Sequence, residues 1–226
     1  MKEGSTQIPL LGDDLWFPPA TNASVDGLVA IGGDLSAPRL LLAYTSGIFP
    51  WFNEDTMILW WSPDPRMVLF PEKLKVSKSM SRLLKTDRFK ITKNHCFSEV
   101  IDACAKAIRP SQEGTWITSE MKNAYLDLHK MGMAASYEVW EDDRLVGGLY
   151  GVDLNGIFCG ESMFSKVSNA SKFAFIKMVE DLQAKNYALI DCQMYTKHLA
   201  SLGAETISRD AFLDILQSTL ADSGNN

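Results

Sequence analysis

Two apolar segments joined by an Asn-Gly pair constrain the fold of this chain more than any other feature. Residues 145–152 and 157–164 each have the length and apolar composition of a strand. Asn155 and Gly156 between them accept the positive φ angles that a tight hairpin turn requires. The two segments therefore predict a β-hairpin.

A helix and a further strand follow the hairpin. Within residues 169–185, apolar side chains recur at a spacing of three, which places them on one helical face; they are Phe173, Ile176, Val179 and Leu182. Residues 187–190 form a short apolar run that predicts a buried strand. The order from residue 145 to residue 190 is therefore strand, strand, helix, strand.

Two acidic residues interrupt these apolar strands. Glu161 follows Gly160, and Asp191 lies two residues before Gln193. A carboxylate in an apolar strand costs free energy unless it is paired or used in chemistry. Both acids are therefore candidate site residues. The alternative is that they only cap strand ends or bind backbone amides.

The rest of the chain predicts a mixed α+β protein. Ser36, Pro38 and Gly47 have the order that is typical of the N-cap, the first turn and the end of a short helix. Pro63 and Pro65 mark a turn, where we place the boundary between a small N-terminal α/β domain, residues 1–64, and a larger domain, residues 65–226. Further strands are predicted at residues 28–31, 67–70, 89–92, 137–141 and 205–208, and further helices at residues 77–86, 98–108, 119–131, 196–202 and 209–220.

Basic residues gather in one stretch of an otherwise acidic chain. The net charge of −6 argues against a protein that coats nucleic acid by bulk attraction. Within residues 71–94, however, eight basic residues occur with only two acidic ones. A solvated helix face explains such a run, and a polyanionic partner explains it as well. The basic residues are Lys73, Lys75, Lys78, Arg82, Lys85, Arg88, Lys90 and Lys93.

Several classes of site and location are not supported. The four cysteines form no C-x-x-C pair and the three histidines lie far apart, so neither a dithiol nor a metal site is expected. The nucleotide-binding loop and the nucleophile elbow are both missing. No apolar run approaches the roughly 20 residues of a membrane span, and residues 1–10 lack a signal-peptide pattern. We expect a cytoplasmic protein that uses no cofactor.

Aromatic residues crowd two loops that contain proline. Three of the six tryptophans fall within residues 47–66, in the segments G-I-F-P-W-F and W-W-S-P-D-P-R. These rings are either part of the core or a platform on which nucleic-acid bases stack.

The strand, strand, helix, strand order resembles that of the GNAT acyltransferases, in which an acceptor amine attacks a bound thioester. This resemblance implies a GNAT-like C-terminal domain with a mixed β-sheet flanked by helices. GNAT enzymes grip the pyrophosphate of acyl-CoA with a loop that bears glycine, whereas residues 165–169 contain none. The difference disfavours acetyl-CoA as the acyl donor.

Seven ordered motifs resemble those of the leucyl/phenylalanyl-tRNA-protein transferase family. They are G-I-F-P-W-F, W-W-S-P-D-P-R, E-G-T-W-I-T, E-V-W-x-x-x-x-L-V-G-G-x-Y-G-V, F-C-G-E-S-M-F-S, N-A-S-K and I-D-C-Q, and they span roughly residues 27–212. The resemblance implies transfer of Leu or Phe, and less well Met, from aminoacyl-tRNA to the N-terminal Arg or Lys of a protein. Such transfer creates an N-degron, a signal for protein degradation.

The same resemblance implies which residues act in the reaction. Gln193 matches a catalytic glutamine of the family, and we expect it to orient the amine or the developing oxyanion. Asp191 is expected to fix the rotamer of Gln193 and to carry negative charge, or, alternatively, only to bind the acceptor. Glu161 is expected to pair with the cationic acceptor. Conversion of an ester into an amide requires neither metal nor ATP.

The family pattern also implies where the aminoacyl-tRNA binds. The aminoacyl pocket is expected to be lined by Leu149, Phe158, Gly160, Phe175, Met178, Leu182 and Ile190. The terminal adenosine is expected to bind among the aromatic residues Trp51, Trp116, Tyr44 and Tyr125. The eight basic residues of the stretch 71–94 are expected to contact the tRNA backbone.

Two other functions stay open. The first is a GNAT acetyltransferase that uses acetyl-CoA. The second is a non-catalytic adaptor that binds basic N-termini for a protease through Glu161 and Asp191. The aromatic loops and the basic stretch have no purpose in such an adaptor. In each case we expect the chain to act as a monomer.

Overall fold

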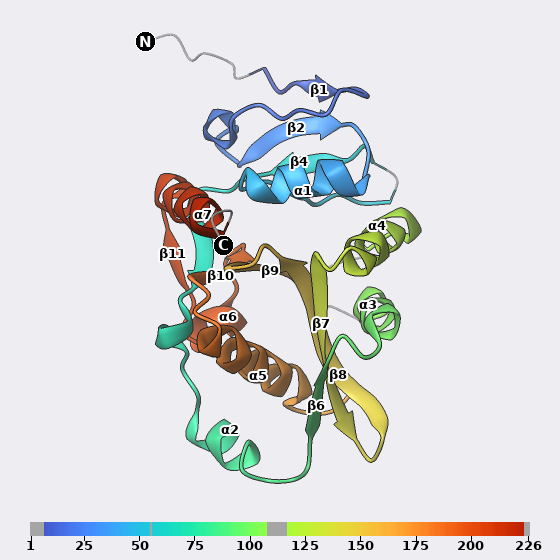
Figure 1. The fold of residues 1–226 in the computed structure, drawn as a ribbon, viewed down its shortest axis with the longest axis vertical. Coiled ribbons are helices and arrows are strands. Elements are labelled where there is room, and N and C mark those ends of the chain that lie inside the picture. The colour runs from blue at the N-terminus through green and yellow to red at the C-terminus, as the bar shows by residue number, and fades with distance from the viewer. Residues whose placement is uncertain (1–6, 55, 108–116, 224–226) are drawn as a thin grey trace.

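The structure is a computed structural model of the 226-residue chain, and it describes residues 7–54, 56–107 and 117–223. The strands form two β-sheets, and helices pack around them (Figure 1). The predicted fold class, α+β with a small N-terminal part and a mixed sheet flanked by helices, is confirmed.

A four-stranded sheet forms the N-terminal part, in the order β1-β2-β4-β3. Its strands are β1 (Leu10–Leu11), β2 (Leu28–Gly32), β3 (Phe49–Pro50) and β4 (Leu59–Trp61), and a short 3₁₀ turn, η1 (Ala20–Asn22), lies between the first two. Trp60 is fully buried in this sheet and donates a hydrogen bond from Nε1 to the Gly32 carbonyl at 2.8 Å. This tryptophan is therefore part of the core.

Helix α1 (Ala37–Thr45) connects β2 to β3 and contacts helices of the C-terminal part (Figure 1). The side-chain cap predicted at Ser36 is wrong, because Ser36 makes no such hydrogen bond. Instead, Asp34 Oδ1 accepts a hydrogen bond from the backbone N of Ser36 at 2.7 Å. Gly47 lies just beyond the helix with a φ of +75°, which glycine adopts without strain.

A seven-stranded sheet forms the C-terminal part, in the order β11-β5-β10-β9-β8-β7-β6. The pairing of β9 with β10 is parallel, and the other described pairs are antiparallel. The strands are β5 (Arg66–Leu69), β6 (Lys90–Lys93), β7 (Ala134–Glu141), β8 (Arg144–Asp153), β9 (Ile157–Ser165), β10 (Leu189–Gln193) and β11 (Glu205–Ile207).

Helices cover both faces of this sheet (Figure 1). The helices of the C-terminal part are η2 (Pro71–Lys73), α2 (Lys78–Leu83), α3 (Phe97–Ala105), α4 (Ser119–Lys130), α5 (Ala170–Ala184), α6 (Lys197–Ser201) and α7 (Arg209–Ser223), of which α3, α4 and α5 contact the sheet. Among the described residues, no helix is both long enough and apolar enough to cross a membrane.

The side chains of β8 alternate between two cores, as the period of a strand requires. Leu149 belongs to the cluster that contains Phe173 of α5. Its neighbour Tyr150 points the other way and packs against Phe97 of α3 and Tyr125 of α4, with ring centroids 5.7 and 5.4 Å apart. The sheet therefore separates α5 from α3 and α4.

The hairpin, the helix and the strand predicted after residue 145 are confirmed, but both ends of the last strand differ from the prediction. Asn155 and Gly156 have φ angles of +55° and +137° at the turn between β8 and β9, and α5 covers the predicted helical segment. The last strand begins two residues later than predicted and continues to Gln193. It extends beyond the apolar run because it pairs with β5 and β9 on its two sides.

The division into domains at residues 64 and 65 stays a prediction. The strands of the two sheets do separate between Trp61 and Arg66. One hydrophobic cluster, however, contains both Leu40 of α1 and Phe212 of α7, so buried apolar contacts continue across the proposed boundary.

Candidate active site

A largely apolar cavity of about 340 Å³ opens between the C-terminal sheet, helices α5 and α6, and the segment after α1. Six of the seven residues predicted for the aminoacyl pocket line it. They are Leu149, Phe158, Gly160, Phe175, Met178 and Ile190. The structure therefore brings these six residues together around one cavity, which has the size of a small-molecule site.

Leu182 is not part of this cavity, which corrects the seventh prediction. It is fully buried in the core cluster that includes Phe173 and Val179. Leu182 lies one helical turn beyond Met178, on the same helix face but farther along α5. The periodicity of a helix predicts the face on which a residue lies, but it does not predict where along the helix a cavity ends.

The sequence did not indicate the part of the cavity wall that follows β10. These lining residues come from the turn after the strand and from α6, and they include Met194, Thr196, His198 and Leu199. Phe49 of β3 and Met163 of β9 also line the cavity. Residues 194–199 follow Gln193 directly, so their closeness to that residue in sequence was the one available signal.

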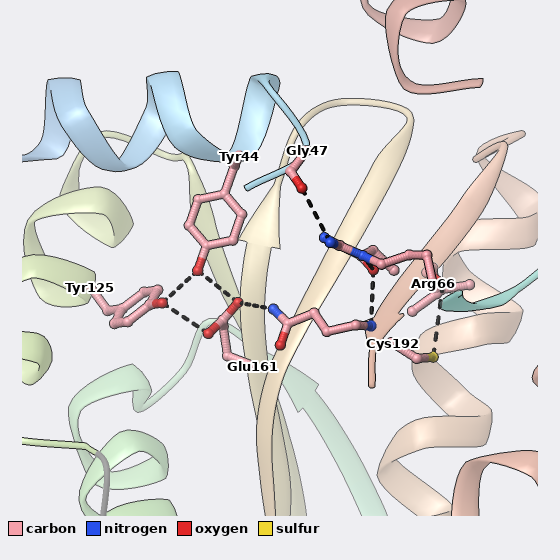
Figure 2. Close-up of polar contacts among 9 residues, drawn as sticks. Tyr44, Gly47, Arg66, Tyr125, Glu161 and Cys192 are labelled. Atoms are coloured by element: carbon pink, nitrogen blue, oxygen red, sulfur yellow. Dashed lines mark hydrogen bonds and ion pairs between the residues drawn. The ribbon is translucent and has the colours of Figure 1, made fainter. Parts of the chain in front are cut away.

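Glu161 lines the cavity and is the centre of a hydrogen-bond network. Tyr44 Oη donates to its Oε1 at 2.7 Å, Tyr125 Oη to its Oε2 at 2.8 Å, and Gln193 Nε2 to its Oε1 at 2.8 Å. Figure 2 shows both tyrosine rings pointing at this carboxyl group. Four elements, α1, α4, β9 and β10, therefore meet at one carboxyl.

Burial is the largest influence on the acidity of Glu161, and it raises the pKa to about 7. The hydrogen bonds from Tyr44, Tyr125 and Gln193 lower the pKa and so partly oppose burial, while the negative charge of Asp191 raises it slightly. Burial also raises the pKa of both tyrosines well above its usual value. Glu161 is therefore the group of this network that changes protonation near neutral pH.

Asp191 is fully buried and forms an ion pair with Arg66 of β5. Arg66 Nε lies 2.8 Å from Oδ1 and Nη2 lies 2.6 Å from Oδ2, so the contact is bidentate. Arg66 Nη1 also donates to the Gly47 carbonyl at 3.1 Å, as Figure 2 shows, and its guanidinium lies between the rings of Phe49 and Phe212. The charge of Asp191 is therefore neutralised inside the protein.

Gln193 is held by both acidic residues, but not in the way predicted. Its backbone N donates to Asp191 Oδ1 at 2.9 Å, and its backbone has a φ of +61°, which is uncommon for a residue other than glycine. The pairing of β10 with β5 is also irregular at this point. Asp191 thus fixes the backbone of Gln193, whereas Glu161 binds its side chain.

The aromatic residues expected around the adenosine lie in different environments. Trp51 is 37% exposed at the edge of the cavity, where its ring faces Trp61 edge to face. Tyr44 and Tyr125 are buried, with their hydroxyls on Glu161, so neither ring offers an open face to a base. This placement corrects their predicted role. Trp116 lies outside the described residues.

The basic stretch lies along η2, α2 and β6, on the side of the molecule away from α1 (Figure 1). Three of its members form ion pairs: Lys73 with Glu205, Arg88 with Glu141, and Lys93 with Asp181. Within the described part of the chain, no ion pair is found for the other five, which are Lys75, Lys78, Arg82, Lys85 and Lys90. These five keep their charge available for a polyanion.

Comparison with known proteins assigns the family. The model of the family described as leucyl/phenylalanyl-tRNA protein transferase matches residues 68–217, and the model of its N-terminal domain matches residues 33–64. The chain belongs to this family. A leucyl/phenylalanyl-tRNA–protein transferase from Flavobacterium johnsoniae is 58% identical over 205 residues, which are 91% of this chain and 97% of that protein. Another from Saccharophagus degradans is 54% identical over 209 residues, 92% of this chain and 86% of that protein.

The resemblance carried by the seven motifs is thereby confirmed, and with it the class of enzyme, an acyltransferase that uses aminoacyl-tRNA. The region matched by the leucyl/phenylalanyl-tRNA protein transferase model includes Glu161, Asp191 and Gln193. The region matched by the N-terminal model includes Tyr44 and Trp51. Both parts of the family pattern therefore contribute side chains to the cavity and its network.

The ion pair of Asp191 leads to a prediction about stability. Asp191→Ala leaves the charge of Arg66 buried without its partner, and we expect it to lower the free energy of unfolding by about 3–5 kcal/mol. Urea denaturation measures this loss. Asp127→Ala, which removes an exposed pair with Lys130, is the control and should change stability by less than about 1 kcal/mol. An Asp191→Ala variant as stable as the wild type would contradict the structural role of the pair.

Proposed function

We propose that the chain transfers Leu or Phe, and less well Met, from aminoacyl-tRNA to the N-terminal Arg or Lys of proteins and so creates an N-degron. The observation that carries the proposal is an apolar cavity whose lining includes Glu161 and Gln193, in a chain that belongs to the transferase family. We place this activity in the cytoplasm, where aminoacyl-tRNA occurs, and assign it to the monomer.

The main contribution of the protein to this reaction is to position the amine and the ester. An ester is converted into a more stable amide, and placing the amine against the carbonyl carbon contributes about 7–11 kcal/mol in favourable cases. The apolar wall holds the aminoacyl side chain, and the polar end of the cavity receives the amine. The reaction therefore depends on how well Gln193 and Glu161 are held in place.

Gln193 is assigned an orienting role. A neutral amide is a poor proton acceptor, but it donates and accepts hydrogen bonds, so it can direct the amine or stabilise the developing oxyanion. Its left-handed backbone and its bond to Glu161 support this role, because both restrict where its side chain lies. The tRNA hydroxyl that leaves takes up one of the protons that the amine loses.

Glu161 is assigned the recognition of the cationic acceptor. Both acidic residues were candidates for this role, but the carboxylate of Asp191 already binds Arg66 and is fully buried. Glu161 lines the cavity and carries no ion pair in the described part of the chain. A carboxyl that is screened from bulk water pairs strongly with an Arg or Lys residue.

The aminoacyl side chain is assigned to the apolar wall. Met163, Met178 and Met194 line it, and their unbranched, flexible side chains adapt to both Leu and Phe. A β-branched donor such as Val or Ile fills this space less well, at about 1–3 kcal/mol for each misplaced methylene. Trp51, and Trp116 from the same family pattern, are assigned to the adenosine, and the basic stretch to the tRNA backbone.

The proposal is tested by following radiolabelled Phe from Phe-tRNA to a protein that begins with Arg. Wild type should transfer the label, RNase should abolish the transfer, and a protein that begins with Ala should remain unlabelled. Gln193→Ala should reduce the rate by about 10²–10³-fold, as loss of an oxyanion donor does. Gln183→Ala, the same change at an exposed position of α5, is the matched control and should retain full activity.

Two other results of this assay would indicate the alternative functions. Binding of the Arg-initiated protein by a folded wild type without transfer would indicate the adaptor. Labelling from acetyl-CoA in place of Phe-tRNA would indicate a GNAT acetyltransferase. Full transfer by Gln193→Ala would overturn the role of this residue while leaving the reaction in place.

Gly160 leads to a prediction about donor choice. A Cβ added there would meet only the carbonyl oxygen of Asp191, at 3.7 Å, so Gly160→Ala should fold normally. Because Gly160 lines the cavity, the methyl group takes space from the donor side chain. We expect kcat/KM to fall about tenfold more for the larger Phe than for Leu. Gly12→Ala, with no atom within 4 Å of the new Cβ, is the control. Equal losses for the two donors would contradict the pocket assignment.

A further inference from the structure

Two buried tyrosine hydroxyls meet the carboxyl group of Glu161, which lines the cavity. The hydroxyl of Tyr44 lies 2.7 Å from Oε1 of Glu161, and the hydroxyl of Tyr125 lies 2.8 Å from Oε2. The two hydroxyls also lie 2.5 Å from each other. These contacts close a ring that joins α1, α4 and β9, and Figure 2 shows all three of them.

The number of protons in this ring decides the state of Glu161. Three hydrogen bonds need three protons, and the two tyrosine hydroxyls carry only two. If Glu161 is a carboxylate, both hydroxyls donate to it, and their oxygens then face each other at 2.5 Å without a proton between them. A third proton, carried by Glu161, satisfies all three contacts.

Gln193 determines which carboxyl oxygen carries the third proton. Its Nε2 donates to Oε1 of Glu161 at 2.8 Å, so Oε1 acts as an acceptor and the proton lies on Oε2. In this protonated form the contact between Tyr125 and Oε2 runs in the opposite direction from that in the carboxylate. Glu161 donates to Tyr125, Tyr125 to Tyr44, and Tyr44 back to Oε1. Each of the three hydroxyl groups donates once in this arrangement.

We propose that the structure shows the protonated form of this ring, and that the deprotonated Glu161 is the catalytic base that takes a proton from the α-ammonium group of the acceptor. The inference rests on the proposed function, because amine attack on an ester is the step that delivers this proton. Glu161 then supplies the proton acceptor of the site, because the side-chain amide of Gln193 is not basic.

The protons of the reaction balance in this scheme. The α-ammonium group begins with three protons, and the amide product keeps one. One proton moves to Glu161 before the nitrogen attacks the carbonyl carbon. The second moves to the ribose oxygen as the ester C–O bond breaks. Glu161 closes the ring with its new proton and releases that proton to water through the cavity before the next turnover.

Other titratable groups surround the ring without replacing it. Asp191 of β10 raises the pKa of Glu161, but its own charge is paired with Arg66 of β5. Tyr150 of β8 packs against Tyr125. Cys159 of β9 and Cys192 of β10 lie nearby, and burial raises the pKa of both thiols. His198 of α6 lines the same cavity. None of these sits in the ring.

The pH dependence follows from the ring. Burial holds the pKa of Glu161 near 7, so the basic form grows as the pH rises through that value. The transfer rate at saturating acceptor should therefore increase with pH and level off above the pKa of Glu161. Each tyrosine hydroxyl binds the carboxylate more strongly than the acid, because hydrogen bonds to a charge are the stronger ones. Removing one hydroxyl should move the midpoint upward by about one pH unit.

Infrared difference spectra of wild type against Glu161→Gln test the ring without any substrate. The C=O stretch of a protonated carboxyl should be present in the wild type and disappear with a midpoint near 7. Tyr125→Phe should raise that midpoint, whereas Tyr187→Phe, which removes a hydroxyl bound to Asp153, should leave it unchanged. Absence of the band, or a midpoint near the ordinary value of 4.5, would overturn the proton count.

Single-turnover transfer of Phe at several pH values tests the role as base. The midpoint of the rate profile should equal the infrared midpoint and shift with it in Tyr125→Phe. Glu161→Gln should lose about 10²-fold or more and lose the pH dependence below neutrality. If Tyr125→Phe shifts the infrared midpoint but leaves the midpoint of the pH–rate profile unchanged, the role of Glu161 as base is overturned. If wild type transfers nothing, the proposed function fails, and the infrared midpoint still decides whether the ring holds a proton.

Discussion

The buried ion pair between Arg66 and Asp191 is the interaction on which the site depends. It joins two strands whose residues lie 125 positions apart, and Arg66 also binds the carbonyl of Gly47 at the end of the N-terminal helix region. Buried pairs of this kind add little net stability compared with apolar residues, but losing one partner is costly. We infer that the pair is kept for geometry, because Asp191 uses the same carboxylate to hold the backbone of Gln193.

The two carboxylates of the site, Asp191 and Glu161, have different roles. Asp191 has a permanent cationic partner and full burial, so it serves as a fixed anion that shapes the end of β10. Among the described residues, the side chains that donate hydrogen bonds to Glu161 are the neutral ones of Tyr44, Tyr125 and Gln193, and burial raises its pKa to about 7. The surroundings separate their roles, since the carboxylate of Asp191 is paired with a guanidinium whereas that of Glu161 accepts hydrogen bonds from neutral side chains.

The sequence predicted the parts of this fold that local patterns determine. The hairpin at Asn155 and Gly156, helix α5 and most of the apolar pocket followed from turn chemistry, periodicity and family motifs. Contacts between distant segments were not predictable in this way. The hydroxyl of Tyr44 reaches Glu161 across 117 positions. The family pattern placed Tyr44 near the adenosine, whereas the structure has it as a buried hydrogen-bond donor to Glu161.

The central claim is that donor and acceptor meet where the apolar cavity reaches Gln193 and Glu161. A crystal structure with a non-reactive amide analogue of phenylalanyl-adenosine tests it most directly. The benzyl group should lie between Met178 and Ile190, and the analogue's carbonyl oxygen should lie about 3 Å from a side-chain atom of Gln193. An analogue bound outside this cavity, or one whose carbonyl is out of reach of Gln193, would contradict the account.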